Sequence, residues 1–281
     1  MSAADPLTDD LLERVLERLG FSQAPVIELA GLEQIYAAWC RSVPFDNVRK
    51  LIHLHNRDTA ALAGDNATEF FEAWLRHGTG GTCWPGHGAL HSLLSALGFD
   101  ADRGIGTMMA SADPPPGHGT VIVRFDDNRY MVDASILHGS PLRLDEQVVT
   151  GVSHPAWGVS CEMRDGRWHV FWLPLHRPAG FDCRLEYFGA TREDFRKRHE
   201  LTRTWSPFNY SVTLRRNRGD AVVGTVYGQR VEIHPDGRIT TVELTREEQL
   251  RLLVDELGIS EELAFALPQD APTPPPPATR R

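Results

Sequence analysis

Residues 80–100, GGTCWPGHGALHSLLSALGFD, place a cysteine between a Gly-Gly-Thr turn and the start of a predicted helix that ends at Gly98. The glycines before Cys83 allow a sharp turn and a close approach of another molecule to the backbone. Unpaired N–H groups and the positive end of the helix dipole stabilise a thiolate at such a position. Free cysteines are also among the most frequently buried residues. From these residues alone, Cys83 is either a nucleophile or a small apolar residue of the core.

A metal site is the third interpretation, because His87 and His91 follow Cys83 at intervals of four residues. Ligands on three consecutive turns would span about 12 Å, too far for one ion with bonds of about 2.0–2.3 Å. The HGALH segment also lacks the glutamate of the H-E-x-x-H zinc motif. We therefore predict no metal site and no permanently bound cofactor.

A cysteine nucleophile needs a base and an acid that orients the base. Of the twelve histidines, His118 is placed best, because it follows the PPPG loop and opens a predicted strand. Asp133 is a lone carboxylate in the apolar strand YMVDASI, where an unpaired charge would be costly. A hairpin turning at DDNR puts Asp133 on the same face as His118 but opposite Ile122, about 13 Å away along an ideal strand. A bulge, a strong twist or barrel closure must bring the two together, and the sequence does not show which.

Composition excludes several classes of partner. The chain has 281 residues and a formal net charge of −9, which argues against nucleic acid, since phosphates are neutralised by clustered Lys and Arg. The N-terminal segment lacks the pattern of a secretory signal, and no run of about 18 apolar residues occurs, so we expect no membrane partner. The cysteines are far apart, which favours the cytoplasm; they are Cys40, Cys83, Cys161 and Cys183.

The periodicity of apolar residues changes along the chain. Helical spacing through about the first 75 residues predicts three amphipathic helices, with an ordered crossover after Pro44. Alternation dominates from about residue 118 to 175 and predicts strands. The last third mixes both, and Thr245 and Glu248 form a capping box. The Pro-rich segment 268–281 has too few apolar side chains to offset its chain entropy, so we predict that it is disordered.

These residues resemble the arylamine N-acetyltransferase family, in which a cysteine after a Gly-Gly turn, a histidine that opens a strand and a Val-Asp aspartate occur in this order. Cys83, His118 and Asp133 match those positions one by one. The resemblance extends to about residue 265 through three further segments, which are VPFDN, ALHSLLSALGFD and REDFRKRHELTRTWSPFNYSVTL.

The resemblance implies an α+β fold with a papain- or transglutaminase-like Cys-His-Asp site. It divides the chain into four parts. Residues 1–98 form a helical bundle with the nucleophile, and residues 99–185 form a β-barrel with the histidine and aspartate. Residues 186–267 form an α/β lid, and residues 268–281 are the Pro-rich tail. It also implies ping-pong acyl transfer, in which an acyl-coenzyme A or carrier-protein thioester acylates Cys83 and a small-molecule amine then attacks. An acyl carrier protein is accordingly a candidate partner.

The chain departs from the family pattern around the nucleophile. The family's R-G-G-Y-C-F-E becomes TGGTCWP, and its Gly-Phe-Gly loop after the aspartate becomes ASILHG. The identities of the acyl donor and of the acceptor are therefore undecided. Three alternative functions also remain, which are an amide synthase of secondary metabolism, a hydrolase with the same triad and a non-catalytic ligand-binding relative. The candidate pocket residues are Phe45, Trp84 and His138. Trp84 is equally compatible with a place in the core, and His138 could instead lie in a solvated loop. We interpret the HLH segment at 53–55 as surface, in a strand or extended loop.

Overall fold

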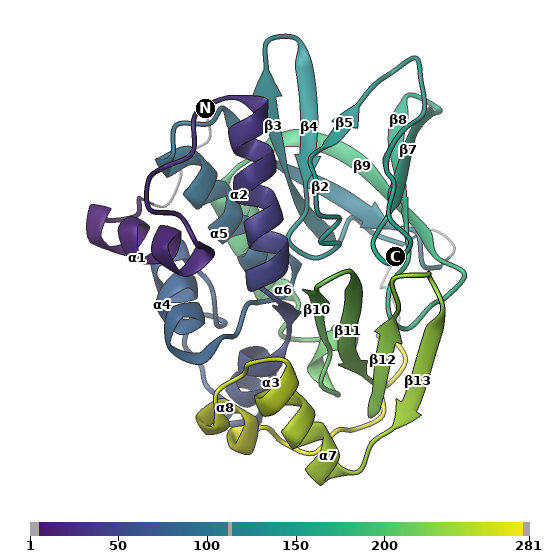
Figure 1. Cartoon of the computed structure of the whole chain (residues 1–281). Coiled ribbons are helices and arrows are strands. Elements are labelled where there is room, and N and C mark those ends of the chain that lie inside the picture. The colour runs from purple at the N-terminus through teal and green to yellow at the C-terminus, as the bar shows by residue number, and fades with distance from the viewer. Residues whose placement is uncertain (1–5, 112–113, 278–281) are drawn as a thin grey trace.

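A computed structural model describes residues 6–111 and 114–277 (Figure 1). Five helices come before the first long strand because apolar residues recur at helical spacing in this part of the sequence. They are α1 (Asp9–Leu19), α2 (Leu29–Ser42), α3 (Val48–His55), α4 (Ala67–His77) and α5 (Cys83–Ala96). All but α3 share one core, in which the Trp39 and Trp74 side chains are almost fully buried.

The segment after Pro44 differs from the predicted crossover, because it contains both a short strand, β1 (Phe45–Asp46), and helix α3. Val48 and Leu51 of α3 pack in a core with Leu214 and Leu253 from the C-terminal part of the chain. The interpretation of the HLH segment as a strand or extended loop is therefore wrong, because the segment ends helix α3. His55 is exposed as expected, whereas the His53 side chain is only 9% exposed.

Eight antiparallel strands form a sheet in the order β5-β4-β3-β2-β9-β8-β7-β6. The strands are β2 (Ala101–Met108), β3 (His118–Phe125), β4 (Asn128–Val132), β5 (Leu142–Leu144), β6 (Thr150–Val152), β7 (Val159–Arg164), β8 (Arg167–Trp172) and β9 (Phe181–Ala190). The Thr150 hydroxyl donates to the Arg143 carbonyl at 2.5 Å and joins the two edge strands. The sheet is thus a nearly closed barrel with its own apolar core.

The hairpin of β3 and β4 turns over two residues, Asp126 and Asp127, because Phe125 pairs with Asn128. The predicted register, which set Asp133 opposite Ile122, is therefore wrong by two residues: Ile122 pairs with Met131, and pairing ends at Val132. In this register the aspartate is two residues closer to His118 along the strand than predicted, and the chain leaves the sheet directly after β4.

The C-terminal part is a second sheet covered by helices. Its order is β1-β10-β11-β12-β13, so the short strand before α3 becomes an edge strand of it. The elements that follow the barrel are α6 (Arg192–Leu201), η1 (Pro207–Asn209), β10 (Leu214–Arg218), β11 (Ala221–Val226), β12 (Gln229–Ile233), β13 (Ile239–Glu243), α7 (Arg246–Arg251), η2 (Leu252–Glu256) and α8 (Glu261–Ala266). The predicted capping box at Thr245 and Glu248 is confirmed.

These layers confirm the α+β class with helical bundle, barrel and C-terminal α/β part. The Pro-rich segment differs from its predicted disorder as far as residue 277. Asp270 Oδ1 accepts from the Val212 N–H at 2.8 Å, and the Ala271 N–H donates to the Tyr210 carbonyl at 2.8 Å. Residues 278–281, the rest of that prediction, lie outside the described residues.

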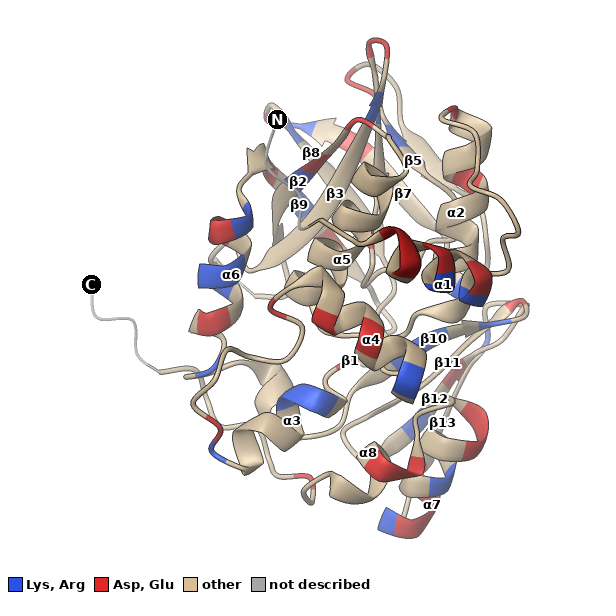
Figure 2. Cartoon of the chain, turned by 90° about the vertical axis from the view of Figure 1, so that its left-hand side faces the viewer, with Lys and Arg blue, Asp and Glu red and all other residues tan. Residues whose placement is uncertain are grey.

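Acidic residues occur on the outer helices, most visibly on α1 and α7 (Figure 2). In the part of the chain that the structure describes, no helix has the length and apolarity needed to cross a membrane.

Candidate active site

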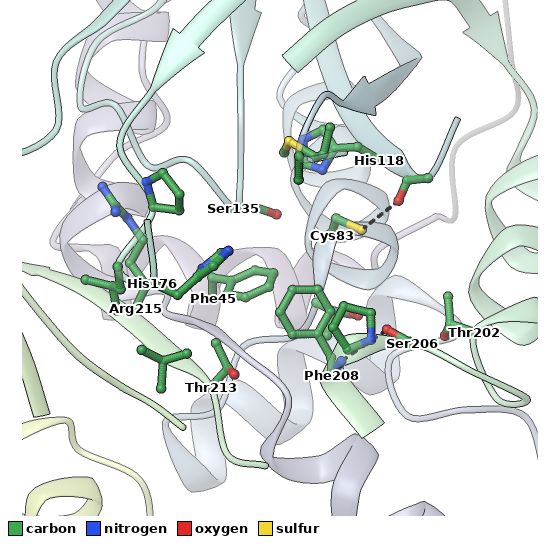
Figure 3. Close-up of a pocket in the computed structure, with 18 of the residues that line it drawn as sticks. Phe45, Cys83, His118, Ser135, His176, Thr202, Ser206, Phe208, Thr213 and Arg215 are labelled. Carbon is green, nitrogen blue, oxygen red and sulfur yellow. Dashed lines mark hydrogen bonds between the residues drawn. The ribbon is translucent and has the colours of Figure 1, made fainter. Parts of the chain in front are cut away.

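Cys83 is the first residue of α5, a helix that packs against α4 of the bundle and against β2 and β3 of the barrel. The Thr82 side chain makes no capping hydrogen bond, and Pro85 in the first turn has no N–H to leave unpaired. The Cys83 Sγ lies 3.7 Å from the Gly117 carbonyl oxygen, next to the start of β3 (Figure 3). The residue is 8% exposed. The thiol therefore faces the barrel from the positive end of a helix.

The turn before Cys83 is held by the buried Asp46. Its carboxylate accepts from the Gly80 N–H at 2.6 Å, the Thr79 hydroxyl at 2.9 Å and the Val48 N–H at 3.0 Å. Burial raises the pKa of Asp46 although these hydrogen bonds oppose the shift. The Asp46 N–H in turn donates to the Gly81 carbonyl at 3.2 Å. Strand β1 thus fixes the Gly-Gly turn and, through it, the position of the thiol.

We expect Gly80→Ala to destabilise the fold by about 1–3 kcal/mol, the range for overpacking a tight site, and to slow modification of Cys83. A Cβ at this position would lie 1.9 Å from the Pro44 carbonyl oxygen, so the turn must move. Gly88→Ala on α5 is the matched control, because a Cβ there meets no atom within 4 Å. Thermal unfolding and the rate of Cys83 alkylation measure both effects. Equal behaviour of the two variants would contradict this role of the turn.

His118 and Asp133 lie in direct contact, with Nε2 and Oδ2 2.8 Å apart. His118 is 2% exposed and Asp133 is fully buried. Burial alone would lower the pKa of His118, but the Asp133 carboxylate and the nearby Cys83 sulfur raise it to about 10. Because Nε2 is used by Asp133, Nδ1 is the nitrogen available to Cys83. The structure therefore brings the three predicted residues together.

The Asp133 carboxylate is held in place by the chain that follows it. Its Oδ1 accepts from the N–H groups of Ser135 and Ile136, each at 2.9 Å. Burial raises the pKa of this carboxyl group, but His87 and His118, the closer of the two rings, hold it well below its usual range. The Tyr36 hydroxyl contacts both the N–H and the carbonyl oxygen of Asp133 at 3.0 Å. This anchor to α2 was not predicted.

His87 is part of the same cluster, although its sequence position suggested only a metal ligand. Its Nδ1 donates to the Cys83 carbonyl at 2.6 Å, and its Nε2 lies 2.8 Å from the Ala134 nitrogen and 3.1 Å from Asp133 Oδ1. Ligand atoms of His87, His118 and Asp133 lie within 4.8 Å of one another, a spacing that a metal ion could use. The hydrogen bonds described above already use these atoms, and a metal would separate His118 from its carboxylate. The donor set therefore fits a hydrogen-bonded network better than a metal centre.

A pocket of about 270 Å³ opens onto Cys83 and His118. Phe45 and Trp84, two of the predicted pocket residues, line it together with Phe208 (Figure 3). Trp84 also packs against a core residue, since its ring lies 5.2 Å from that of Phe195. The Ser135 hydroxyl, which was not predicted, lines the pocket and has no hydrogen-bond partner among the described residues. The walls are mostly apolar, with a few polar groups.

The predicted pocket role of His138 is wrong, and so is its alternative as a solvated loop residue. The side chain is fully buried, its Nδ1 lies 2.7 Å from the Ser140 carbonyl and its ring lies 5.0 Å from that of Tyr36. It does not contribute to the wall of the pocket. Burial lowers its pKa to about 4, so it is a neutral core residue. The loop after Asp133 turns inward here because Leu137 adopts a positive φ of 56°.

Comparison with known proteins shows relatives by sequence and shows the same fold among solved structures. A family model described as N-acetyltransferase matches residues 28–264. The arylamine N-acetyltransferase of Mycolicibacterium smegmatis is 30% identical over 178 residues, which are 57% of this chain and 62% of that protein. The chain thus aligns with less than two thirds of the length of this relative.

Solved structures share the fold. The arylamine N-acetyltransferase of Mycobacterium abscessus matches with a TM-score of 0.78 and 20% identity, covering 91% of this chain and 93% of that one. The Mycobacterium marinum enzyme in complex with CoA matches with a TM-score of 0.76 and 17% identity, covering 91% and 97%. With the family model spanning most of the sequence, the chain belongs to the arylamine N-acetyltransferase family.

Proposed function

We propose that the chain is an N-acyltransferase that carries the acyl group on Cys83 between a thioester donor and an amine. The observation that carries this proposal is the contact between His118 and Asp133 directly beside a cysteine at the start of a helix. Membership of the family and the pocket that opens onto the thiol support it.

In the first half-reaction, the Cys83 sulfur attacks the carbonyl carbon of the thioester, and its proton is held by His118. The bond to the donor sulfur then breaks, and His118 returns the proton to the departing thiol. In the second half-reaction, the amine attacks the acyl-cysteine and His118 takes the amine proton. Breaking the bond to Sγ releases the amide and restores the starting pair. Asp133 stabilises the imidazolium that each step requires.

The first turn of α5 supplies a site for the negative oxygen of each tetrahedral intermediate. The first N–H groups of a helix have no partner within the helix. Thr82 does not cap them, and Pro85 contributes none, so those of Cys83 and Trp84 are the groups closest to the reacting carbon. Oriented N–H donors of this kind are typically a large part of catalysis in acyl transfer.

The donor class is an acyl-coenzyme A or a carrier-protein thioester. The structure of the M. marinum relative contains CoA, which supports the first of these. We propose a small-molecule amine as acceptor, an acyl carrier protein as the alternative donor-bearing partner, and the cytoplasm as the compartment. All four cysteines of this chain are free, in keeping with a reducing compartment.

Intact mass after mixing with acyl-CoA and acyl-carrier-protein donors tests the proposal. We expect one acyl adduct on the wild type and on the control Cys161→Ala, none on Cys83→Ala, and loss of the adduct when an amine is added. Release of CoA at a rate that does not depend on added amine would show that the protein is a hydrolase and not a transferase. The absence of an adduct with every donor would contradict the proposal and leave a ligand-binding relative.

A further inference from the structure

Besides His118, two buried basic side chains line the pocket, and no Asp or Glu is found among the described residues of its wall. They are Lys50 of α3 and Arg215 of β10, each 4% exposed. This local charge is opposite to that of the chain, whose formal net charge is −9. Many acidic residues lie on outer helices such as α1 and α7 (Figure 2).

Lys50 has unused hydrogen-bonding capacity. Its Nζ donates to the Thr202 hydroxyl at 2.8 Å, and that hydroxyl donates onward to the His199 carbonyl at 2.6 Å. Of the three N–H donors of a lysine ammonium, two therefore have no partner in the described part of the chain. The nearest carboxylate that affects Lys50, Glu200, pairs with Arg203 instead. Burial lowers the pKa of Lys50 to about 7, although the nearby Cys83 sulfur and Glu200 oppose this shift.

Arg215 is also a cation without a carboxylate among the residues the structure describes. Its Nη1 donates to the Leu173 carbonyl at 3.0 Å, its Nε has no partner, and its guanidinium lies 5.8 Å from the centre of the Trp172 ring. Figure 3 shows Arg215 on the opposite side of the pocket from Cys83, whereas Thr202, the partner of Lys50, lies on the side of Cys83. Positive charge thus lines both sides of the space that a substrate would fill.

A buried charge without a partner is costly, and a bound anion offsets this cost. The phosphates of CoA do not provide that anion, because the pantetheine arm separates them from the thioester and a pocket of about 270 Å³ is at the small end for a bound ligand. Besides the Cys83 sulfur, which itself affects Lys50, we expect the anion in the part of a substrate that reaches Cys83. Carboxylate is a common anionic group that an acyl chain or an amine of this size can carry.

We propose that Lys50 binds a carboxylate carried by the substrate, within a pocket whose positive potential Arg215 reinforces. This inference rests on the proposed function for the identity of the substrate as an acyl donor or an amine. Lys50 is a specificity-determining residue in this assignment. The carboxylate belongs either to the acyl donor or to the amine, and the experiment below distinguishes these two sources.

The experiment measures equilibrium binding by calorimetry on the Cys83→Ala background, which cannot turn over. One arm compares succinyl-CoA with pentanoyl-CoA, and the other compares 4-aminobenzoate with 4-aminobenzamide. We expect the carboxylate to bind at least about tenfold more tightly in one arm, the gain typical of a hydrogen bond to a charged group. The arm that shows this preference identifies the source.

Lys50→Met should reduce that preference to about twofold or less, and Lys50→Arg should retain it. Lys197→Met, an exposed lysine on α6, is the matched control and should bind like its parent. A lack of preference in both arms, a preference that survives Lys50→Met, or an equal loss for both members of a pair would overturn the proposal. Because binding is measured without transfer, these outcomes are independent of the intact-mass test of the proposed function.

Discussion

Asp133→Asn slows the acylation of Cys83 by up to about 10⁴-fold, by analogy with the same change in serine triads. The reason is the direction of the hydrogen bonds around this side chain. The N–H groups of Ser135 and Ile136 both point at Oδ1, so an asparagine must place its oxygen there. Its NH₂ group then faces His118 Nε2, which has to accept. The ring proton moves to Nδ1, and His118 can no longer take a proton from Cys83.

Stopped-flow release of CoA in a single turnover measures this loss, and a thermal melt measures the fold. Asp145→Asn is the matched control, because Asp145 Oδ1 accepts from the N–H groups of Gln147 and Val148 in the same way, and among the described residues its ion-pair partner is Arg143 rather than a histidine. We expect this control to acylate at the wild-type rate. Acylation of Asp133→Asn within about tenfold of wild type would show that the carboxylate does not set the tautomer.

The three residues at the centre of the site could be predicted because each carries a local signal. A cysteine after a Gly-Gly turn predicts a helix start, a histidine after a proline loop predicts a strand start, and an aspartate in an apolar strand demands a partner. The same reasoning gave the periodicity of the elements, whereas the α+β class was implied by the resemblance to a family. These signals depend only on neighbours in the sequence.

The contact distance between His118 and Asp133 could not be predicted, because it depends on the register of the hairpin. The prediction placed four residues in the turn, whereas the structure uses two and ends the pairing at Val132. A change of two residues keeps both side chains on the same face, so the predicted face was right although the predicted separation was not.

Residues that reach the site from distant parts of the chain carried no signal of their own. His87 contacts Ala134 across 47 positions, and Tyr36 contacts Asp133 across 97. Lys50 donates a hydrogen bond to Thr202, which is 152 residues away in the sequence. His138 shows the reverse error: a histidine in a Gly-Ser loop suggested solvent, but the loop folds inward over α2. Only the tertiary fold decides these positions.

In the folded protein at pH 7, iodoacetamide alkylates Cys83 and leaves the other three cysteines unmodified. Burial raises the pKa of Cys40 and of Cys161 to about 12 and raises that of Cys183 well above its usual value, so these buried thiols stay protonated. Cys83 alone faces a pocket and lies beside an imidazole ring that Asp133 keeps charged. Peptide mass spectrometry after a timed reaction measures each site separately.

His118→Ala should slow this alkylation at pH 7 by about 10- to 100-fold, since a neighbouring cation is one of the main factors that stabilise a thiolate. The pH dependence has a definite sign. Because the pKa of His118 is raised to about 10, its positive charge is present at neutral pH and is lost only as the pH rises through about 10. The wild-type rate should therefore change little between pH 7 and 9. In the variant, the rate should rise about tenfold per pH unit towards the ordinary thiol pKa of about 8.5.

The matched control for that experiment is His55→Ala, which removes an exposed histidine at the end of α3. It should follow the wild-type profile, because its ring lies outside the pocket. If wild type, His118→Ala and His55→Ala shared one steep profile, then His118 would not stabilise the sulfur, and the contact of His118 with Asp133 would serve only to anchor the start of β3. A flat profile that His118→Ala alone makes steep would instead require a charge at His118, because the helix start is the same in all three proteins.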